Sequence, residues 1–211
     1  MKKLLLMLLC TFFVKGVNAQ EATTIQLNAP NKHRGEVMMQ ALEKRQSVRE
    51  YADKKLSLQD ISDLLWAANG INRPERGLRT APTAGNLQEI DLYVCFEEGA
   101  YLYDAKAHEL KMVTDKDVRK HLAETQTFVE KSPAVLLIVA NTSRMNRYGD
   151  SSLIFSAYGA GIVSQNISLF CSACGLGTVP RAFMNKEKTA EALGLDDTYI
   201  LHLNHPVGYM K

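Results

Sequence analysis

Hydrophobic positions recur at two different periods along this chain of 211 residues, and the two periods predict a mixture of helices and strands. Spacings of three and four residues predict helices at 34–45, between Ser57 and Gly70, at 115–126, 150–174 and 186–193. Short apolar or alternating runs predict strands at 90–96, 100–104, 109–113, 134–140 and 199–204. Helices and strands do not alternate strictly, so the pattern favours the α+β class.

Two of these segments carry more information than the others. Residues 134–140 are apolar without interruption, which is typical of a central strand buried on both faces. Residues 150–174 are apolar or small on nearly every side and would form a helix roughly 37 Å long at 1.5 Å per residue. A helix that is apolar all round must be buried all round. A domain of this size can rarely bury it alone, so we expect a partner subunit.

The N-terminus has the pattern of a secretory signal. Met1-Lys2-Lys3 is basic, Leu4 to Val14 carries no charge, and Ala19 stands before a predicted cleavage site at Gln20. The apolar stretch is shorter than the roughly 20 residues that span a bilayer. We therefore predict a signal at 1–19, an extended arm at 20–33 and a domain at 34–211, in a protein exported to the periplasm or secreted. A short uncleaved anchor is the alternative.

Cleavage changes the charge of the chain. Removing Lys2, Lys3 and Lys15 leaves 22 basic residues against 23 acidic ones, a formal charge of −1. A chain with this balance has no electrostatic basis for binding nucleic acid or an anionic membrane. No later apolar run is long enough to form a membrane helix, so we expect no insertion after cleavage.

Cysteine and histidine residues give weak signals. An odd number of cysteines would remain after cleavage, namely Cys95, Cys171 and Cys174, so at least one thiol would be free. Cys171 and Cys174 have redox-motif spacing but lie inside a helical pattern, which favours buried small side chains and leaves a disulfide or redox pair open. The five histidines show no zinc spacing, and we expect no metal site.

Three segments are candidates for ligand binding. Arg45, Ser47 and Arg49 stand at alternate positions, so an extended backbone would direct them to one side, where two guanidinium groups suit a phosphate. Surface ion pairs with Glu43 or Glu50 are the alternative. Residues 79–86, within a loop at 71–89, could bring backbone close to a flat ligand or form an ordinary surface loop. Residues 175–177 could do the same or simply end a helix.

Taken together, six segments resemble the nitroreductase superfamily of FMN-dependent oxidoreductases, most closely its SagB-type dehydrogenase branch. They follow in family order and spacing: Arg45–Tyr51, Leu64–Gly70, Arg79–Gly85, Gly159–Gly161, Gly175–Thr178 and Pro206–Tyr209. The resemblance implies a three-layer fold with a central, mostly antiparallel sheet flanked by helices. It also implies a homodimer with two FMN sites at the subunit interface, each built from both chains.

The resemblance also implies a set of cofactor-binding residues: Arg45, Gln46, Ser47, Arg49, Pro82, Thr83, Ala84, Gly85, Asn86, Gly175, Leu176, Gly177 and Lys211. Residues 45–49 would hold the phosphate and ribityl chain. Residues 82–86 would come from the partner chain and line the ring, with Thr83 in place of the usual serine. Residues 175–177 would bring backbone N–H groups near flavin N5. Lys211 would replace basic contacts that many relatives carry in a C-terminal extension.

The function implied is an exported oxidoreductase that passes hydride or electrons through flavin N5 to a nitroaromatic, a quinone or another small acceptor. No catalytic side chain is then required, because the cofactor performs the chemistry. Soluble NAD(P)H is expected in the cytosol, so export would require a different donor. The alternative is a non-catalytic protein that uses the interface cavity for another ligand. A purely structural dimer would leave Arg45 and Arg49 unexplained, and azoline oxidation is not implied.

Overall fold

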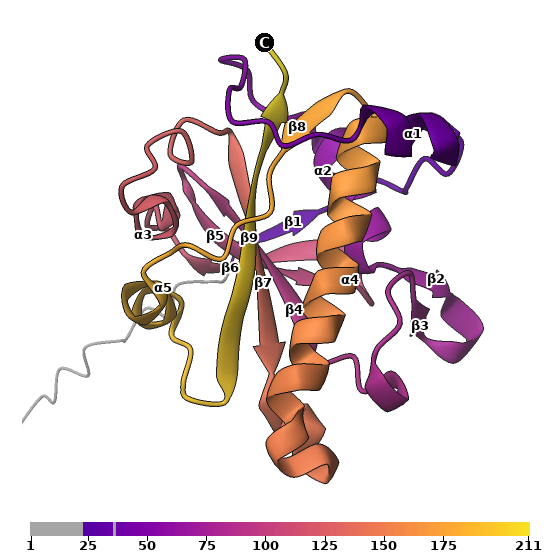
Figure 1. The fold of residues 1–211 in the computed structure, drawn as a ribbon, viewed down its shortest axis with the longest axis vertical. Coiled ribbons are helices and arrows are strands. Elements are labelled where there is room, and N and C mark those ends of the chain that lie inside the picture. The colour runs from indigo at the N-terminus through magenta and orange to yellow at the C-terminus, as the bar shows by residue number, and fades with distance from the viewer. Residues whose placement is uncertain (1–22, 36) are drawn as a thin grey trace, which may run out of the picture.

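A seven-stranded sheet runs through the middle of the molecule (Figure 1). The computed structural model describes residues 23–35 and 37–211, so the predicted signal at 1–19 lies outside the described residues. The strand order is β1-β6-β5-β4-β7-β9-β8, and each neighbouring pair is antiparallel. The strands are β1 Thr24–Gln26, β4 Ile90–Phe96, β5 Gly99–Asp104, β6 Glu109–Thr114, β7 Ala134–Asn141, β8 Leu176–Thr178 and β9 Tyr199–Tyr209.

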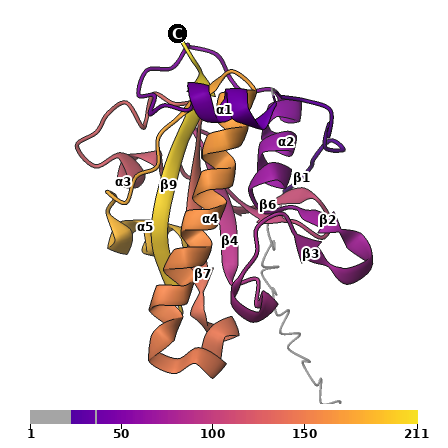
Figure 2. The same cartoon turned by 45° about the vertical axis from the view of Figure 1, so that its right-hand side comes forward.

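Helices cover both faces of this sheet and give the three predicted layers (Figures 1 and 2). One face carries α1 Met38–Lys44, α2 Leu58–Asn69 and α4 Ser152–Ala173; the other carries α3 Arg119–Ala123 and α5 Lys186–Leu193. Each face has its own apolar core, and the strand β7 contributes to both. Leu136 and Ile138 pack with α2 and α4, while Val135, Leu137 and Val139 pack with α3 and α5. This double burial is why the sequence of β7 is apolar without interruption.

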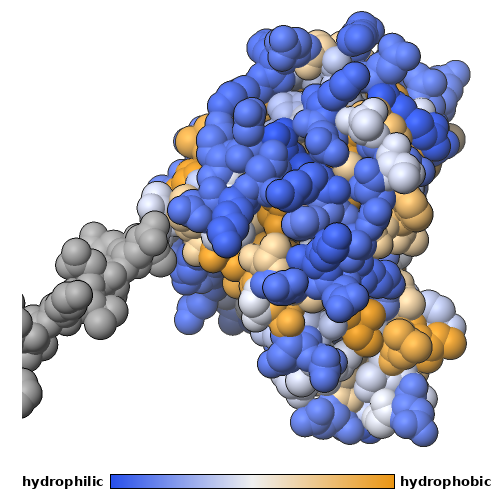
Figure 3. All heavy atoms as spheres, turned by 90° about the vertical axis from the view of Figure 1, so that its left-hand side faces the viewer, coloured by the Kyte–Doolittle hydropathy of each residue, from blue (hydrophilic) through white to orange (hydrophobic). Residues whose placement is uncertain are grey.

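The long helix α4 is buried on one side only. Its buried residues include Gly159, Val163 and Ile167, which face the sheet and α2. The opposite side exposes apolar side chains, and Leu153, Ile154, Tyr158 and Ile162 are between 38% and 58% exposed. By contrast, the side of the molecule with α3 and α5 is largely hydrophilic (Figure 3). The single chain therefore leaves uncovered the helix for which the sequence predicts a partner subunit.

The prediction that no later run is long and apolar enough to cross a membrane was wrong in one respect. The stretch Thr142–Ala173 meets that description by length and composition. In the structure, α4 packs against α1, α2 and several strands, so we assign it to the core of the domain.

Two predicted helices are shorter than expected, for local backbone reasons. The helix predicted at 34–45 begins only at Met38, because Gly35 has φ +99° and Val37 is extended, with ψ 149°. The helix predicted at 115–126 covers Arg119–Ala123, because Glu124 adopts φ +52°, outside the helical range. The helix after Ser57 begins with a capping box between Ser57 and Asp60, which the order Ser-x-x-Asp favours.

Three segments are more ordered than their sequences suggested. The described part of the arm contains β1, which pairs with β6. The loop at 71–89 contains a hairpin of β2 Ile71–Arg73 and β3 Leu78–Arg79, with short 3₁₀ turns at Pro74–Arg76 and Ala84–Asn86. The strand predicted at 199–204 continues through Pro206 to Tyr209. The proline is tolerated because β8 ends opposite Val207, one residue away.

The cysteines behave as buried or half-buried free thiols. Cys95, Cys171 and Cys174 are all free. Burial raises the pKa of the Cys171 and Cys174 thiols. A raised pKa disfavours the reactive thiolate. The interpretation of Cys171 and Cys174 as packing residues is therefore favoured over a redox pair.

Candidate functional site

The segment from Arg45 to Arg49 lies alongside the edge strand β8. The backbone N–H of Val48 donates to the carbonyl of Thr178 at 2.9 Å. The Val48 side chain packs onto Gly177, where an added Cβ would lie 2.6 Å from Val48 Cγ1. Only glycine permits this approach at position 177. Two segments that are some 130 residues apart in the sequence are thus brought into direct contact.

The predicted phosphate-binding side chains are free to take a ligand. Arg45, Ser47 and Arg49 are exposed, and among the residues that the structure describes their side chains make no hydrogen bond and no ion pair. The alternative of ion pairs with Glu43 or Glu50 is therefore not observed. Two guanidinium groups without carboxylate partners form a site suited to an anion.

The two arginines line different clefts, and Ser47 lines neither of them. The Arg45 cleft, of about 460 Å³, is lined by Arg45, Gln46, Val48, Gly175, Leu176 and Met210 among others. The Arg49 cleft, also about 460 Å³, is lined by Arg49, Gln126, Phe128 and residues 179–183. Both volumes lie in the range of small-molecule sites. Four residues of extended chain span roughly 13 Å, so the two guanidinium groups can contact two ends of one ligand.

The predicted glycine segment has a dual role. Gly175 adopts φ +70° immediately after Cys174, the C-cap of α4, so it ends the helix, which is one of the two predicted roles. Leu176 and Gly177 are buried in β8 and pair with the end of β9. The segment is held in place by His205 on β9, which contacts the Thr178 hydroxyl at 3.2 Å and the Ser164 hydroxyl at 2.8 Å. Burial lowers the pKa of His205 to about 3, so this histidine is neutral.

The predicted ring-lining loop, residues 82–86, lies in a different part of the molecule. The carbonyl of Gly85 accepts a hydrogen bond from Arg147, which precedes α4, at 3.0 Å, and the Thr83 hydroxyl accepts from the Gln88 N–H at 2.9 Å. Residues 82–86 therefore adjoin the N-terminal end of α4, whereas Arg45–Arg49 adjoin the residues that follow its C-terminal end. The 22 residues of α4 separate these ends by roughly 33 Å. One chain does not bring the two predicted halves together (Figures 1 and 2).

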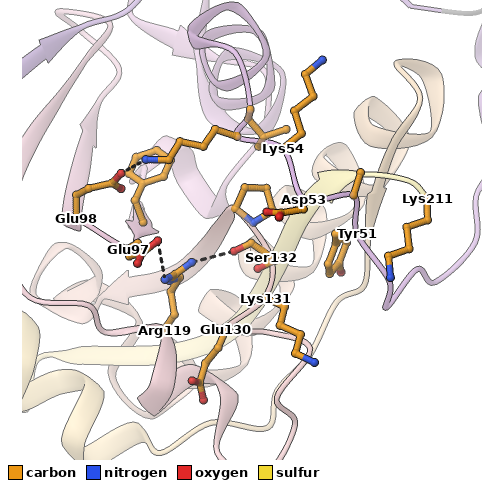
Figure 4. A pocket seen from close by; sticks show the side chains of 15 residues that line it. Tyr51, Asp53, Lys54, Glu97, Glu98, Arg119, Glu130, Lys131, Ser132 and Lys211 are labelled. Atoms are coloured by element: carbon orange, nitrogen blue, oxygen red, sulfur yellow. Dashed lines mark hydrogen bonds and ion pairs between the residues drawn. The ribbon is translucent and has the colours of Figure 1, made fainter.

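Lys211 lines a third cleft, of about 560 Å³, beside Tyr51 (Figure 4). Some of the charged side chains in this cleft have partners. Lys55 forms an ion pair with Glu98, and Arg119 donates to Asp117 and to the Ser132 carbonyl. The neighbouring Met210 lines the Arg45 cleft, so Lys211 stands at the edge of that site rather than within it.

Sequence reasoning missed the segment that follows β8. Arg181, Phe183 and the more distant Gln126 and Phe128 all line the Arg49 cleft. Arg181 is only 7% exposed, although it follows the exposed Pro180. An arginine next to the glycine segment was the available signal, but its burial depends on α3 and β9 and could not be seen in the sequence.

The comparisons with known proteins decide the family. The sequence model of the Nitroreductase family matches residues 42–209. The chain belongs to the nitroreductase family. A Methanocaldococcus jannaschii protein, provisionally named a nitroreductase, is 36% identical over 175 residues, which cover 78% of this chain and 87% of that protein. The SagB-type branch stays a prediction.

Solved structures agree with this assignment. A Ralstonia eutropha protein described provisionally as a nitroreductase is 36% identical, with a TM-score of 0.83 over 89% of this chain and 90% of that chain. An FMN-dependent nitroreductase from Clostridium difficile shares the fold, with a TM-score of 0.59, 18% identity and coverage of 82% and 88% of the two chains. The predicted three-layer nitroreductase fold is thus confirmed, and the family supports an oxidoreductase function.

Proposed function

We propose that this nitroreductase-family protein is an FMN-dependent oxidoreductase that passes electrons from a donor to a small acceptor such as a nitroaromatic or a quinone. The main support for this proposal is the pair of arginines without partners, Arg45 and Arg49, in two adjoining clefts. The packing of Val48 on Gly177 holds their segment in place. An elongated ligand with an anionic end suits this arrangement. FMN fits that description.

The residues present fit FMN at both ends. Arg45 would hold the phosphate, since an exposed guanidinium group without a partner suits phosphate oxygens. The exposed Ser47 hydroxyl lines neither cleft and would have to turn toward the phosphate to contact it. Arg49 would face the ring end, beside the apolar surfaces of Phe128 and Phe183. When bound, FMN supplies reversible two-electron transfer between donor and acceptor. The protein would bind the cofactor, orient it and exclude water from part of the ring.

We also infer that the site is completed by a second copy of the chain. A two-fold axis through the middle of α4 would place the N-terminal end of one α4 beside the C-terminal end of the other. Residues 82–86 of one copy would then reach Arg45–Arg49 of the other across roughly 33 Å of helix. The exposed apolar face of α4, with Ala157 and Gly161 permitting close approach, supports such an antiparallel pairing.

We predict that the purified chain is yellow and that the cofactor it releases is FMN. The absorption spectrum and mass analysis of the released cofactor test this directly. Dithionite should bleach the flavin absorption, and a quinone or nitroaromatic should restore it. A colourless protein that cannot be reconstituted with FMN would rule the function out. Bound FMN that no acceptor reoxidises would favour the non-catalytic alternative.

We further propose that the enzyme acts outside the cytoplasm, on the basis of the signal-like pattern at 1–19. Its electron donor would then be something other than soluble cytosolic NAD(P)H. Expression of the full chain with cell fractionation should recover a form outside the cytoplasm whose N-terminal residue is Gln20. A full-length chain found only in the cytosol would remove the proposal of export without affecting that of FMN binding.

A further inference from the structure

The Arg49 cleft contains a buried positive charge that has no counter-ion. Arg181 is 7% exposed and donates from Nε to Gln126 Oε1 at 2.9 Å, and from Nη1 to the Leu122 carbonyl at 3.0 Å and to Asn204 Oδ1 at 2.5 Å. All three acceptors are neutral. The third nitrogen, Nη2, is buried without a partner. Among the described residues, no carboxylate forms an ion pair with this guanidinium.

Arg119 shows how unusual this arrangement is within the same molecule. It is also 7% exposed, but it donates to both oxygens of Asp117, at 3.0 and 2.7 Å, and to the Ser132 carbonyl at 3.0 Å. Figure 4 shows its guanidinium group directed at Glu97 and Ser132. Buried charges in proteins are normally paired in this way, because desolvation of an unpaired ion is costly. Arg181 departs from that rule.

The Phe128 ring, whose centroid lies 5.6 Å from Arg181 Cζ, attracts the guanidinium through a cation–π contact but carries no negative charge. Arg49 lines the same cleft and brings a second positive charge. Burial lowers the pKa of Arg181, and Arg49 lowers it further, while Tyr51 opposes the effect. An arginine side chain nevertheless keeps its proton in proteins. The buried charge of Arg181 therefore lowers the stability of the folded chain. An anionic group bound in the cleft would offset this destabilisation.

We propose that Arg181 tunes the cofactor, favouring the reduced form by placing an uncompensated cation beside the ring end of FMN. This inference rests on the proposed function. The cleft suits a ring better than a phosphate, because Phe128, Pro180, Phe183 and Val179 provide apolar walls. Uptake of two electrons and one proton from a reductant leaves a flavin ring with one negative charge. A nearby cation stabilises that state more than the neutral oxidised ring.

The sharpest test adds a counter-ion and leaves Arg181 in place. Gln126→Glu keeps the hydrogen bond to Arg181 Nε and neutralises the charge. We expect reduced FMN to lose about tenfold more affinity than oxidised FMN, which lowers the two-electron potential by about 30 mV. The same variant without cofactor should unfold at a higher temperature, because the buried charge gains a partner. These opposite changes separate tuning from structural damage.

Matched variants complete the test. Arg181→Gln should lower the potential as Gln126→Glu does, and Arg181→Lys should keep the wild-type value because it keeps the charge. Arg119→Gln removes an equally buried but paired arginine and should leave the potential unchanged. The measurements are spectroelectrochemical titrations of holoprotein reconstituted with FMN and, separately, with riboflavin.

Two results would overturn the inference. The first is an unchanged potential in Gln126→Glu with FMN bound. The second is a shift that occurs with FMN and disappears with riboflavin, which would assign Arg181 to the phosphate instead. Failure to bind FMN at all, in the wild-type chain, would contradict the proposed function and is recognised before any variant is measured.

Discussion

Replacement of both Arg45 and Arg49 by alanine is expected to weaken FMN binding by at least about 100-fold. Both side chains are exposed, lack protein partners and line adjoining clefts. A hydrogen bond to a charged group contributes roughly 1.5–3 kcal/mol, and two such contacts exceed the roughly 2.8 kcal/mol that corresponds to 100-fold. Fluorescence titration of the apoprotein with FMN measures the effect.

The control for this prediction removes the same amount of charge from another surface. Arg76 and Lys116 are both exposed and line none of the three clefts described above. Arg76→Ala with Lys116→Ala should therefore bind FMN as the wild-type chain does. The single variant Arg45→Ala should weaken FMN binding far more than riboflavin binding, because it loses only a phosphate contact. Equal affinity of the arginine double variant and the wild-type chain would remove both arginines from the site.

Ile162→Lys is expected to separate the proposed dimer and to release FMN. Ile162 is 38% exposed and stands at the middle of α4, Ser152–Ala173. In an antiparallel, two-fold pairing of α4, this residue meets its own copy, so the substitution places two like charges together. Like charges in an interface cost several kcal/mol, which raises the dimer dissociation constant by a factor on the order of 10³. Sedimentation velocity and FMN stoichiometry provide the measurements.

Val113 is a matched control for this substitution. It is also 38% exposed and apolar, but it lies on β6, away from α4. Val113→Lys should leave both the oligomeric state and the FMN content unchanged. If Ile162→Lys stays dimeric with a full complement of FMN, the subunits must meet through a different face. If it is monomeric and keeps FMN, the loop at 82–86 is not needed from a partner.

Local patterns predicted the secondary structure well and its boundaries less well. The strand at 134–140 and the capping box at Ser57 follow directly from residue order, because burial on two faces and helix capping need only neighbours in sequence. The start of α1 and the end of α3 depend on the backbone at Gly35 and Glu124, where φ is positive. The hairpin within 71–79 and the pairing of β1 depend on distant partners, so periodicity could not identify them.

The sequence predicted the candidate site only in part, because part of it depends on contacts between distant residues. Motif order brought residues 45–49 and 175–177 into one hypothesis, and the structure places Val48 directly on Gly177. It separates Arg45 and Arg49 into two clefts and keeps residues 82–86 at the far end of α4. These placements depend on strand register and helix length, which are set by packing across the whole sheet.

By itself, the sequence determined the class of fold, the burial of the strand at 134–140 on both faces and the family to which the chain belongs. These properties depend on periodicity and on motif order, and both follow directly from the order of the residues. Only the tertiary structure decided that Arg181 is a buried cation without a counter-ion and that α4 keeps one apolar face exposed. Burial and charge pairing are properties of the space around a side chain, and residues distant in sequence create that space.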